Sequence, residues 1–316
     1  MKTAILILLA GAMLPAGAPQ GEEGVLRLGP VTLLHPPERH GSAVAFMNVL
    51  PDVLAAVRSF TGAELRRPIR IELVPDHQAL LERVADLGGW EPDPWIEGLA
   101  YPRRRLILIR LDARGSRRHR VEGLLTHELT HIALGEFAAA EGAAEIPRWF
   151  DEGVAQLAEG RPLTQLFWDL PMRARFGLLI PLESLDEAFR EPGGRRALAY
   201  VQAESFLRHL TRRRGSRRLV RAVLADVAAG MPLEASIQRH TWMSLRQHEM
   251  TWENALTGDV AGSLRAMAPL IFGIFVGVSA LVILWRMARR RRMIEEAWDR
   301  EEAWSGGAGE NEAEAP

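Results

Sequence analysis

The feature that most constrains the fold is a run of six residues, Thr126-His127-Glu128-Leu129-Thr130-His131. On an α-helix, two histidines four residues apart project from one face, so both imidazoles can bind the same metal ion. Uncharged, apolar residues flank the run on both sides, as is typical of a helix buried beneath a cleft. The sequence therefore predicts a buried helix over residues 120–140 with one metal-binding face.

A second motif, Trp149-Phe150-Asp151-Glu152-Gly153, lies in an apolar, helix-like context and offers Glu152 as a third ligand. Two histidines and one carboxylate leave a fourth position for water, which is the arrangement of a catalytic zinc ion rather than a structural one. Glu128, next to His127, can reach a water at that position and is the candidate general base. The alternative is a helix that carries two histidines on one side by coincidence.

These motifs resemble the gluzincin metallopeptidases, the clan of thermolysin and of many aminopeptidases, and are most similar to the peptidase MA-like family of bacterial membrane or exported proteins. The resemblance covers residues 68–215. It implies a zincin-like α+β domain that hydrolyses peptides or proteins with one Zn²⁺. It also implies that His127, His131 and Glu152 are the zinc ligands, and that Glu128 is the general base and later the proton donor.

Further roles follow less directly from the sequence. A tetrahedral oxyanion needs a donor besides the metal, and Tyr200 is the candidate, with a buried structural tyrosine as the alternative. Three other histidines are weaker candidates and are expected to be surface or satisfied helix residues: His209, His240 and His248. A ligand histidine usually needs an acceptor for its second nitrogen. Asp151 is expected to point elsewhere, and Gln156, on the face of Glu152, leaves that acceptor undetermined.

An open strand edge beside the motif helix would hold extended peptide by backbone pairing. Residues 106–111, which follow Gly98-Leu99-Ala100-Tyr101, are the candidate for this edge, and an ordinary sheet strand is the alternative. Aminopeptidases of the clan carry a Gly-Ala-Met-Glu-Asn motif here, whose glutamate captures the free amine of the substrate. This segment has no such glutamate, so aminopeptidase activity is not supported and an endopeptidase is expected.

The composition suits one or two globular domains, because the chain has 316 residues, 47% of them hydrophobic, and a net charge of −1. A net charge so close to zero gives no reason to expect nucleic acid as a partner. The chain has no cysteine, which excludes disulfides and a thiol nucleophile.

Two segments indicate a membrane location. Lys2, an apolar run over residues 4–14 and small residues at 16–18 predict a signal peptide over 1–18, with an uncleaved anchor as the alternative. Residues 266–285 are uncharged for long enough to cross a bilayer. Arginines at 286 and 289–292 place the following end in the cytoplasm. The prediction is a single-pass protein of the cytoplasmic membrane that contacts lipid through this helix. Its zinc domain (19–258) lies outside, and a basic flank with a disordered acidic tail (286–316) lies inside.

Hydrophobic periodicity predicts a small N-terminal mixed sheet and a helical C-terminal subdomain. Strands are expected over residues 26–34, 69–74 and 106–111, and helices over 43–60, 78–87, 147–158, 195–210, 216–229 and 243–256. Ser42 is the candidate N-cap of the first helix, and Pro51 is expected to kink or break it. Six arginines form a basic cluster that is either a solvated face or a contact for anionic lipid heads: Arg212, Arg213, Arg214, Arg217, Arg218 and Arg221.

The sequence thus predicts a membrane-anchored zinc metallopeptidase that acts on extracytoplasmic peptides or proteins. The alternative is a membrane-anchored binding or assembly protein whose zinc site is relict or non-proteolytic.

Overall fold

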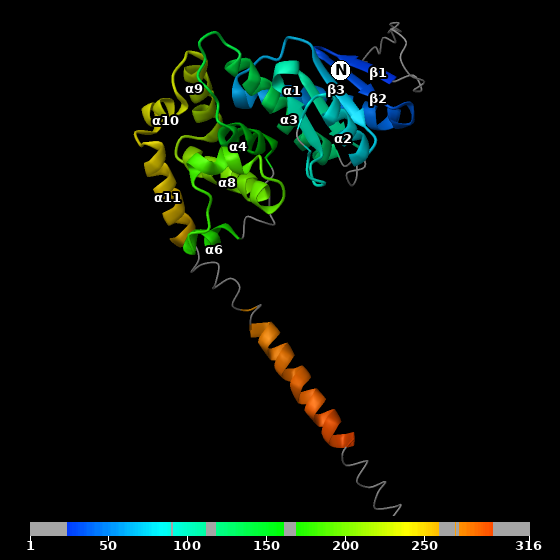
Figure 1. The fold of residues 1–316 in the computed structure, drawn as a ribbon, viewed down its shortest axis with the longest axis vertical. Helices are drawn as coiled ribbons and strands as arrows, with labels where there is room; N and C mark the ends of the chain where they lie inside the picture. Colours follow the sequence, from blue (N-terminus) through cyan, green and yellow to red (C-terminus); the bar gives the residue numbers. More distant parts are fainter. Residues whose placement is uncertain are drawn as a thin grey trace, which may run out of the picture. The chain divides into compact units, whose positions relative to one another are not determined.

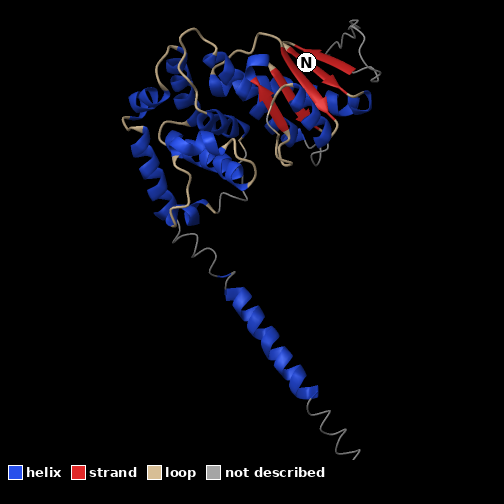
Figure 2. Cartoon of the chain, in the orientation of Figure 1, coloured by secondary structure: helices blue, strands red, loops and turns tan. Residues whose placement is uncertain are grey.

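The structure is a computed structural model that describes residues 24–89, 91–111, 118–160, 169–258, 269 and 272–292, apart from the side chains of 118 and 119. It divides into two units, Met1–Thr257 and Gly258–Pro316. In the first unit, a half that carries the strands adjoins a half built only of helices (Figure 1, Figure 2). The predicted signal peptide (1–18) and acidic tail (293–316) lie outside the described residues.

The strands form one sheet in the order β1-β2-β3-β5-β4. Their bounds are Gly24–Leu28 (β1), Val31–His35 (β2), Ile69–Val74 (β3), Gly98–Tyr101 (β4) and Leu106–Arg110 (β5). The two central pairings, β2 with β3 and β3 with β5, are parallel, and the two outer pairings are antiparallel. The prediction of a small mixed sheet within an α+β fold is therefore confirmed.

The sheet differs from the prediction at both ends. The single strand expected over 26–34 is a hairpin, because Gly29 adopts a φ of 56° and turns the chain between β1 and β2. The prediction that residues 106–111 form the open edge is wrong, since β5 lies between β3 and β4 and is buried. The edge strand beside it is the short β4.

Helices cover both faces of the sheet. Alternate residues of β3, such as Ile71 and Leu73, pack with α1 (His40–Thr61) and α3 (Arg118–Ala138). On the other face, Leu106 and Leu108 of β5 pack against α2 (His77–Asp86). The N-cap of α2 is Asp76, whose carboxylate accepts a hydrogen bond from Ala79 N at 2.9 Å.

The α1 helix begins earlier than predicted and continues through its proline. His40 is its first residue, so Ser42 lies inside the helix and is not its N-cap. Pro51 cannot donate a backbone hydrogen bond, yet the helix is not broken there, because buried residues on both sides, Leu50 and Val53, hold it in the core.

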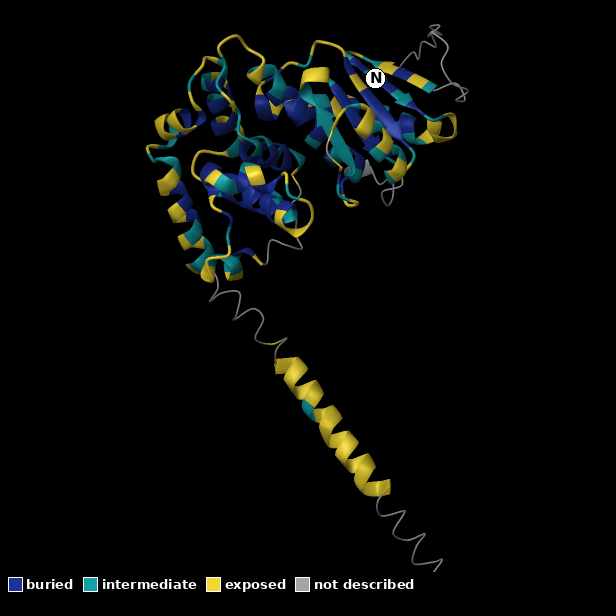
Figure 3. Ribbon diagram, viewed as in Figure 1, coloured by how far each residue is buried: buried dark blue, intermediate teal, exposed yellow. Residues whose placement is uncertain are grey.

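Among the residues that the structure describes, two helices are long and apolar enough to cross a membrane. One spans residues Pro37–Thr61, and the apolar side of its α1 part packs against α3 and the sheet. The other, Phe272–Arg292 in the second unit, buries nothing, and its side chains are exposed along almost its whole length (Figure 3). This helix overlaps the predicted span 266–285. It resembles a membrane-spanning helix in its length and its composition.

The helical half is built around α4 and α8. Its helices are α4 (Arg148–Glu159), α6 (Leu170–Arg175), α7 (Leu185–Ala188), α8 (Gly194–Thr211), α9 (Ser216–Ala228), α10 (Leu233–Thr241) and α11 (Leu245–Gly258). A Cβ at Gly153 would lie 3.0 Å from Ala203 O, so this glycine allows α4 and α8 to approach closely.

The α3 helix lies between the two hydrophobic cores. Leu125 and Leu129 belong to the core of the sheet half, and Leu134 belongs to that of the helical half. The predicted motif helix is therefore the element that both halves share, and α4 packs directly against it.

Candidate metal centre

Three side chains converge where α3 and α4 meet. The rings of His127 and His131 have centroids 4.9 Å apart on one face of α3, as their spacing predicts. Glu152 on α4 points its Oε2 atom at both rings, 3.6 Å from His127 Nε2 and 3.5 Å from His131 Nε2. One ligand atom from each of the three residues lies within 4.8 Å of the others, so the group could hold a metal ion.

The separations fit an ion better than direct hydrogen bonds. Ligand atoms bound tetrahedrally to zinc at about 2.0–2.2 Å lie about 3.3–3.6 Å from one another. Hydrogen bonds between nitrogen and oxygen are shorter, at about 2.7–3.2 Å. Glu152 Oε2 is also buried and has no hydrogen-bond donor among the described residues. A divalent cation would satisfy this carboxylate oxygen and both imidazoles together.

The other oxygen of Glu152 is held by the protein. Glu152 Oε1 accepts hydrogen bonds from Arg148 Nη2 and from the Tyr200 hydroxyl, each at 3.2 Å. Burial alone would raise the pKa of Glu152, but His131, His127 and Arg148 outweigh it and hold this pKa well below the usual value. The carboxylate is therefore ionised, with one oxygen oriented by the protein and the other free to bind a cation.

The N-terminus of α4, the helix that carries Glu152, is capped by a side chain of another helix. No side chain of α4 caps its own N-terminus. Asp186 on α7 does so instead, because its carboxylate accepts the backbone N–H groups of Arg148 at 3.0 Å and Trp149 at 2.9 Å. Trp149 is buried in the same core as Leu134 of α3.

Asp151 contacts a ligand histidine, which contradicts the expectation that it points elsewhere. Its Oδ1 lies 2.9 Å from His131 Nδ1. A proton on Nδ1 makes this a hydrogen bond and leaves Nε2 free to bind a metal. Asp151 and Glu152 are consecutive residues of α4, and both reach nitrogen atoms of His131.

Glu159 approaches the Nδ1 atom of His127, as Asp151 approaches that of His131, but at a longer distance. Its Oε2 lies 3.4 Å from His127 Nδ1. The sequence reasoning missed this residue, although Glu159 is seven positions after Glu152 and so lies two turns along the same helix face. Gln156, one turn after Glu152, is buried, and its Oε1 has no hydrogen-bond partner in the part of the chain that the structure describes.

The surrounding carboxylates shift the pKa of both histidines upward. Burial lowers the pKa of His127, but Glu152 and Glu159 outweigh it and raise this pKa to about 9. For His131, burial is likewise outweighed by Asp151 and Glu152, and the pKa lies well above its ordinary value. In the metal-free protein, therefore, the carboxylates keep positive charge on the two histidines at neutral pH. The same carboxylates would stabilise a metal cation bound in place of these protons.

Glu128 is buried beside the histidines and packs against the edge strand. Burial raises its pKa. A Cβ at Gly98, the first residue of β4, would lie 2.5 Å from Glu128 Oε1 and 2.9 Å from Glu128 Cδ. Only glycine leaves room for the carboxylate at this position.

Tyr200 reaches the centre from α8. Its ring makes edge-to-face contacts with Trp95, at a centroid distance of 5.4 Å, and with Phe189, at 5.0 Å. Burial and the nearby Glu152 raise the pKa of Tyr200, so its hydroxyl stays protonated. Trp95 belongs to a loop that is joined to α8 by an ion pair between Asp93 and Arg196, with 2.6 Å between Oδ2 and Nη1.

A cavity of about 1000 Å³ opens beside the centre. Its walls include Leu99 and Tyr101 of β4 on one side and His131, Arg148 and Asp151 on the other. The edge strand thus borders the same cleft as His131, one of the three candidate ligands.

The three weaker histidine candidates lie elsewhere and have partners, as expected. His209 Nε2 lies 3.1 Å from Thr251 Oγ1, His240 Nε2 lies 2.9 Å from Asp226 Oδ2, and His248 Nε2 lies 2.8 Å from Thr241 Oγ1.

Comparison with known proteins agrees with the geometry. A family model described as the Peptidase MA superfamily matches residues 50–258, a span that holds every residue of the centre. No curated protein matches the chain. Proteins of this superfamily are typically metal-dependent, which points to a zinc peptidase. Because the match covers more than half of the sequence, the chain belongs to the Peptidase MA superfamily, a gluzincin-type family of the kind that its two motifs resemble.

Proposed function

We propose that this protein is a membrane-anchored zinc endopeptidase that hydrolyses extracytoplasmic peptides or proteins. The observation that carries the proposal is that the two carboxylate oxygens of Glu152 have different surroundings. One oxygen accepts hydrogen bonds from Arg148 and Tyr200, while the other faces two imidazole Nε2 atoms with no donor of its own among the described residues. An ionised carboxylate held in this way is suited to complete a site for one Zn²⁺ with His127 and His131.

Zinc bound there would supply Lewis-acid polarisation of the scissile carbonyl and would lower the pKa of a water molecule. Glu128 would take the proton of the attacking water and return it to the departing amine. Its burial suits this role, because burial raises the pKa of the carboxyl and so makes it a stronger base than an exposed glutamate.

Tyr200 would stabilise the negative charge that develops on the carbonyl oxygen. Its hydroxyl is protonated, and because its one hydrogen is donated to Glu152 Oε1 in this structure, it would turn from Glu152 to the substrate oxygen. Trp95 and Phe189 hold the ring from two sides, so the donor is oriented before substrate arrives.

The substrate would lie along β4. This strand pairs with β5 on one side only, so alternate backbone groups of its other side are available to an extended peptide. The cleft of about 1000 Å³ that β4 borders leads to His131. The segment Gly98–Tyr101 carries no glutamate to capture an amino terminus, which supports endopeptidase over aminopeptidase action.

The helix Phe272–Arg292 would anchor the enzyme. It is apolar over the length of a bilayer and ends in arginines at 289–292, which favours a cytoplasmic C-terminal side. With a signal peptide at the other end of the chain, this topology puts the zinc domain outside the cytoplasmic membrane.

Two substitutions test the proposal. His131→Ala should reduce the zinc content of the purified full chain from about one per molecule to near zero. Glu128→Gln should keep the zinc and lower peptide hydrolysis by about 10²–10⁴-fold. His240→Ala, a histidine outside the centre, is the matched control and should change neither quantity.

Two outcomes would contradict the proposal. Full hydrolysis by Glu128→Gln would show that another group is the base. Stoichiometric zinc in the wild-type protein without cleavage of any member of a broad peptide library would favour an anchored binding or assembly protein.

A further inference from the structure

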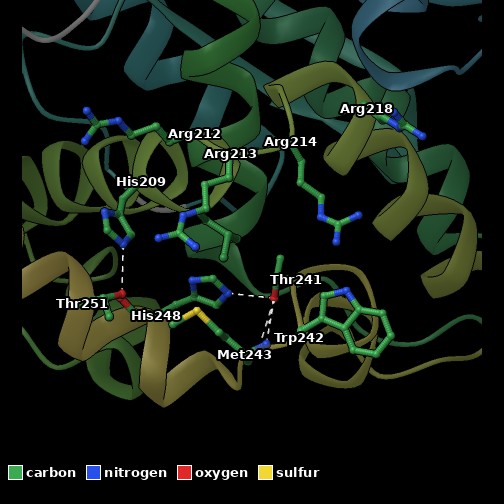
Figure 4. A pocket seen from close by; sticks show the side chains of 11 residues that line it. His209, Arg212, Arg213, Arg214, Arg218, Thr241, Trp242, Met243, His248 and Thr251 are labelled. Atoms are coloured by element: carbon green, nitrogen blue, oxygen red, sulfur yellow. Dashed lines mark hydrogen bonds between the residues drawn. The ribbon is translucent and has the colours of Figure 1, made fainter.

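A second cavity, of about 940 Å³, lies away from the metal centre and is lined by basic side chains (Figure 4). The turn from α8 to α9 and the turn from α10 to α11 form much of its wall. We call it the basic hollow and define it by Arg212, Arg213, Arg214, Arg218, His209 and His248. No aspartate or glutamate is among the described residues that line it.

The arginines of the basic hollow have no acidic partner within the described part of the chain. None of the four makes an ion pair with a described residue, whereas nearby arginines do. Arg208 on α8 pairs with Glu204 at 2.6 Å, and Arg239 on α10 pairs with Asp226 at 3.4 Å. Arg213 and Arg214 extend across the hollow, between His209 and Trp242, while Arg212 and Arg218 lie at its margins (Figure 4). An anion in the hollow would meet guanidinium groups that have no competing carboxylate.

Each histidine of the basic hollow donates a hydrogen bond from Nε2 to a threonine. Thr241 donates its hydroxyl hydrogen to Ile237 O, so it accepts from His248 Nε2. Thr251 donates to His248 O and therefore accepts from His209 Nε2. In each ring the Nδ1 atom makes no hydrogen bond with a described residue. Burial and then the neighbouring arginines lower the pKa of His209, and burial, His209 and Arg213 lower that of His248, which indicates a positive potential.

Trp242 marks the rim. It is 82% exposed, and it follows α10 with a φ of 65°, a conformation that is unusual for a bulky residue. Its backbone N–H closes the helix through a hydrogen bond of 2.8 Å to Gln238 O. An indole ring held outward beside arginines is typical of a side chain that sits at the level of lipid headgroups.

We propose that the basic hollow binds the phosphate group of an anionic lipid headgroup, with Arg213 and Arg214 on the phosphate and Trp242 at the headgroup level. Arginine is well matched to phosphate because its planar donors bind two oxygens at once. Free phosphate would offer the same charge, but it leaves the exposed indole of Trp242 and the neighbouring Met243 without a role. An apolar helix in the same chain, Phe272–Arg292, favours the lipid source. The proposal does not depend on the zinc centre.

The test uses the full chain in neutral detergent, titrated separately with phosphatidylglycerol, phosphatidylcholine and inorganic phosphate. Tryptophan emission reports binding, and the same titration of Trp242→Phe isolates the contribution of Trp242. Phosphatidylglycerol should shift this emission to shorter wavelength, and phosphatidylcholine should not. Arg213→Gln/Arg214→Gln should weaken phosphatidylglycerol binding about 25-fold, at about fivefold for each arginine near a lipid surface.

The control is Arg27→Gln/Arg217→Gln, which removes the same charge from exposed arginines that do not line the hollow. It should bind phosphatidylglycerol like the wild type. Equal weakening of both double variants would show non-specific attraction and overturn the site. Saturation by inorganic phosphate at lower concentration than by phosphatidylglycerol would identify a soluble anion as the ligand and overturn the lipid assignment. An unchanged zinc content would show that the variants are folded.

Discussion

Two pairs of histidines in this molecule sit in opposite electrostatic surroundings. At the metal centre, the carboxylates of Asp151, Glu152 and Glu159 surround one pair and raise its pKa values, that of His127 to about 9. In the basic hollow, burial and arginines lower the pKa values of the other pair.

The comparison shows that a pair of histidines does not by itself identify a metal site. Both pairs offer ring nitrogens, but only the first has an ionised carboxylate aimed at the space between the rings. The sign of the neighbouring charges decides which ligand can enter: a cation at the centre, an anion in the hollow. Mutations and pH titrations can test this contrast between the metal centre and the basic hollow.

The largest expected effect is the pH dependence of zinc binding. A histidine whose folded pKa is raised holds its proton up to that pKa, so zinc must displace it. Zinc affinity should therefore fall by about tenfold per pH unit for each protonated ligand histidine as pH drops below about 9. In the metal-free protein the same protons stabilise the fold below the unfolded pKa, and this stability is lost as pH rises through about 9.

Chelator-competition titrations over a range of pH measure this dependence. Calorimetry in buffers of different ionisation enthalpy counts the protons released. If the affinity for zinc does not change with pH, the carboxylates do not raise the pKa values of His127 and His131.

The second prediction concerns the close packing of the metal centre, which contrasts with the open basic hollow. Gly98→Ala should displace the Glu128 carboxylate, since the new Cβ would lie 2.5 Å from its Oε1. A displacement of about 1 Å at a reacting group costs roughly 100-fold in rate. We expect kcat to fall by that order while zinc content and melting temperature stay near wild type.

Gly41→Ala is the control, because nothing lies within 4 Å of a Cβ built there. Loss of zinc in Gly98→Ala would show that the glycine supports the fold of the centre and not the base alone.

The third prediction separates the two ligand histidines. Asp151→Asn should weaken zinc binding about 10–100-fold, as is usual when a hydrogen-bond partner of a ligand histidine is altered. Glu159→Gln should have a smaller effect, because its oxygen lies 3.4 Å from His127 Nδ1 rather than 2.9 Å. Zinc dissociation constants measure both, with Asp86→Asn on α2 as the control. The reverse ranking would show that these distances do not reflect the strength of the two contacts.

The smallest expected effect lies in the basic hollow. Arg213→Gln removes a positive charge that lowers the pKa of both His209 and His248. Both pKa values should rise, while that of His127 stays unchanged. NMR titration of the histidine ring protons measures the shift, and Arg217→Gln is the control. A downward shift would contradict the electrostatic account of the hollow.

Much of the fold could be predicted from the sequence. The β-branched run of β3 and the helices α2, α4, α8 and α9 appear near their predicted bounds. Elements that depend on a turn were harder to place, since the hairpin of β1 and β2 requires the positive φ of Gly29. The α1 helix survives Pro51 because tertiary packing outweighs the loss of one hydrogen bond.

The sequence by itself determined which residues converge at the metal centre. His127 and His131 share a helix face because of the helical period, and Glu152 belongs to the next helical motif along the chain. Only the tertiary structure decided which carboxylate accompanies each histidine, that β4 and not β5 is the sheet edge, that Gly98 lies against Glu128, and that unpaired arginines enclose a hollow. The physical reason is that helix spacing is a local property, whereas these contacts join elements whose crossing angle and strand order are set by the packing of the whole core.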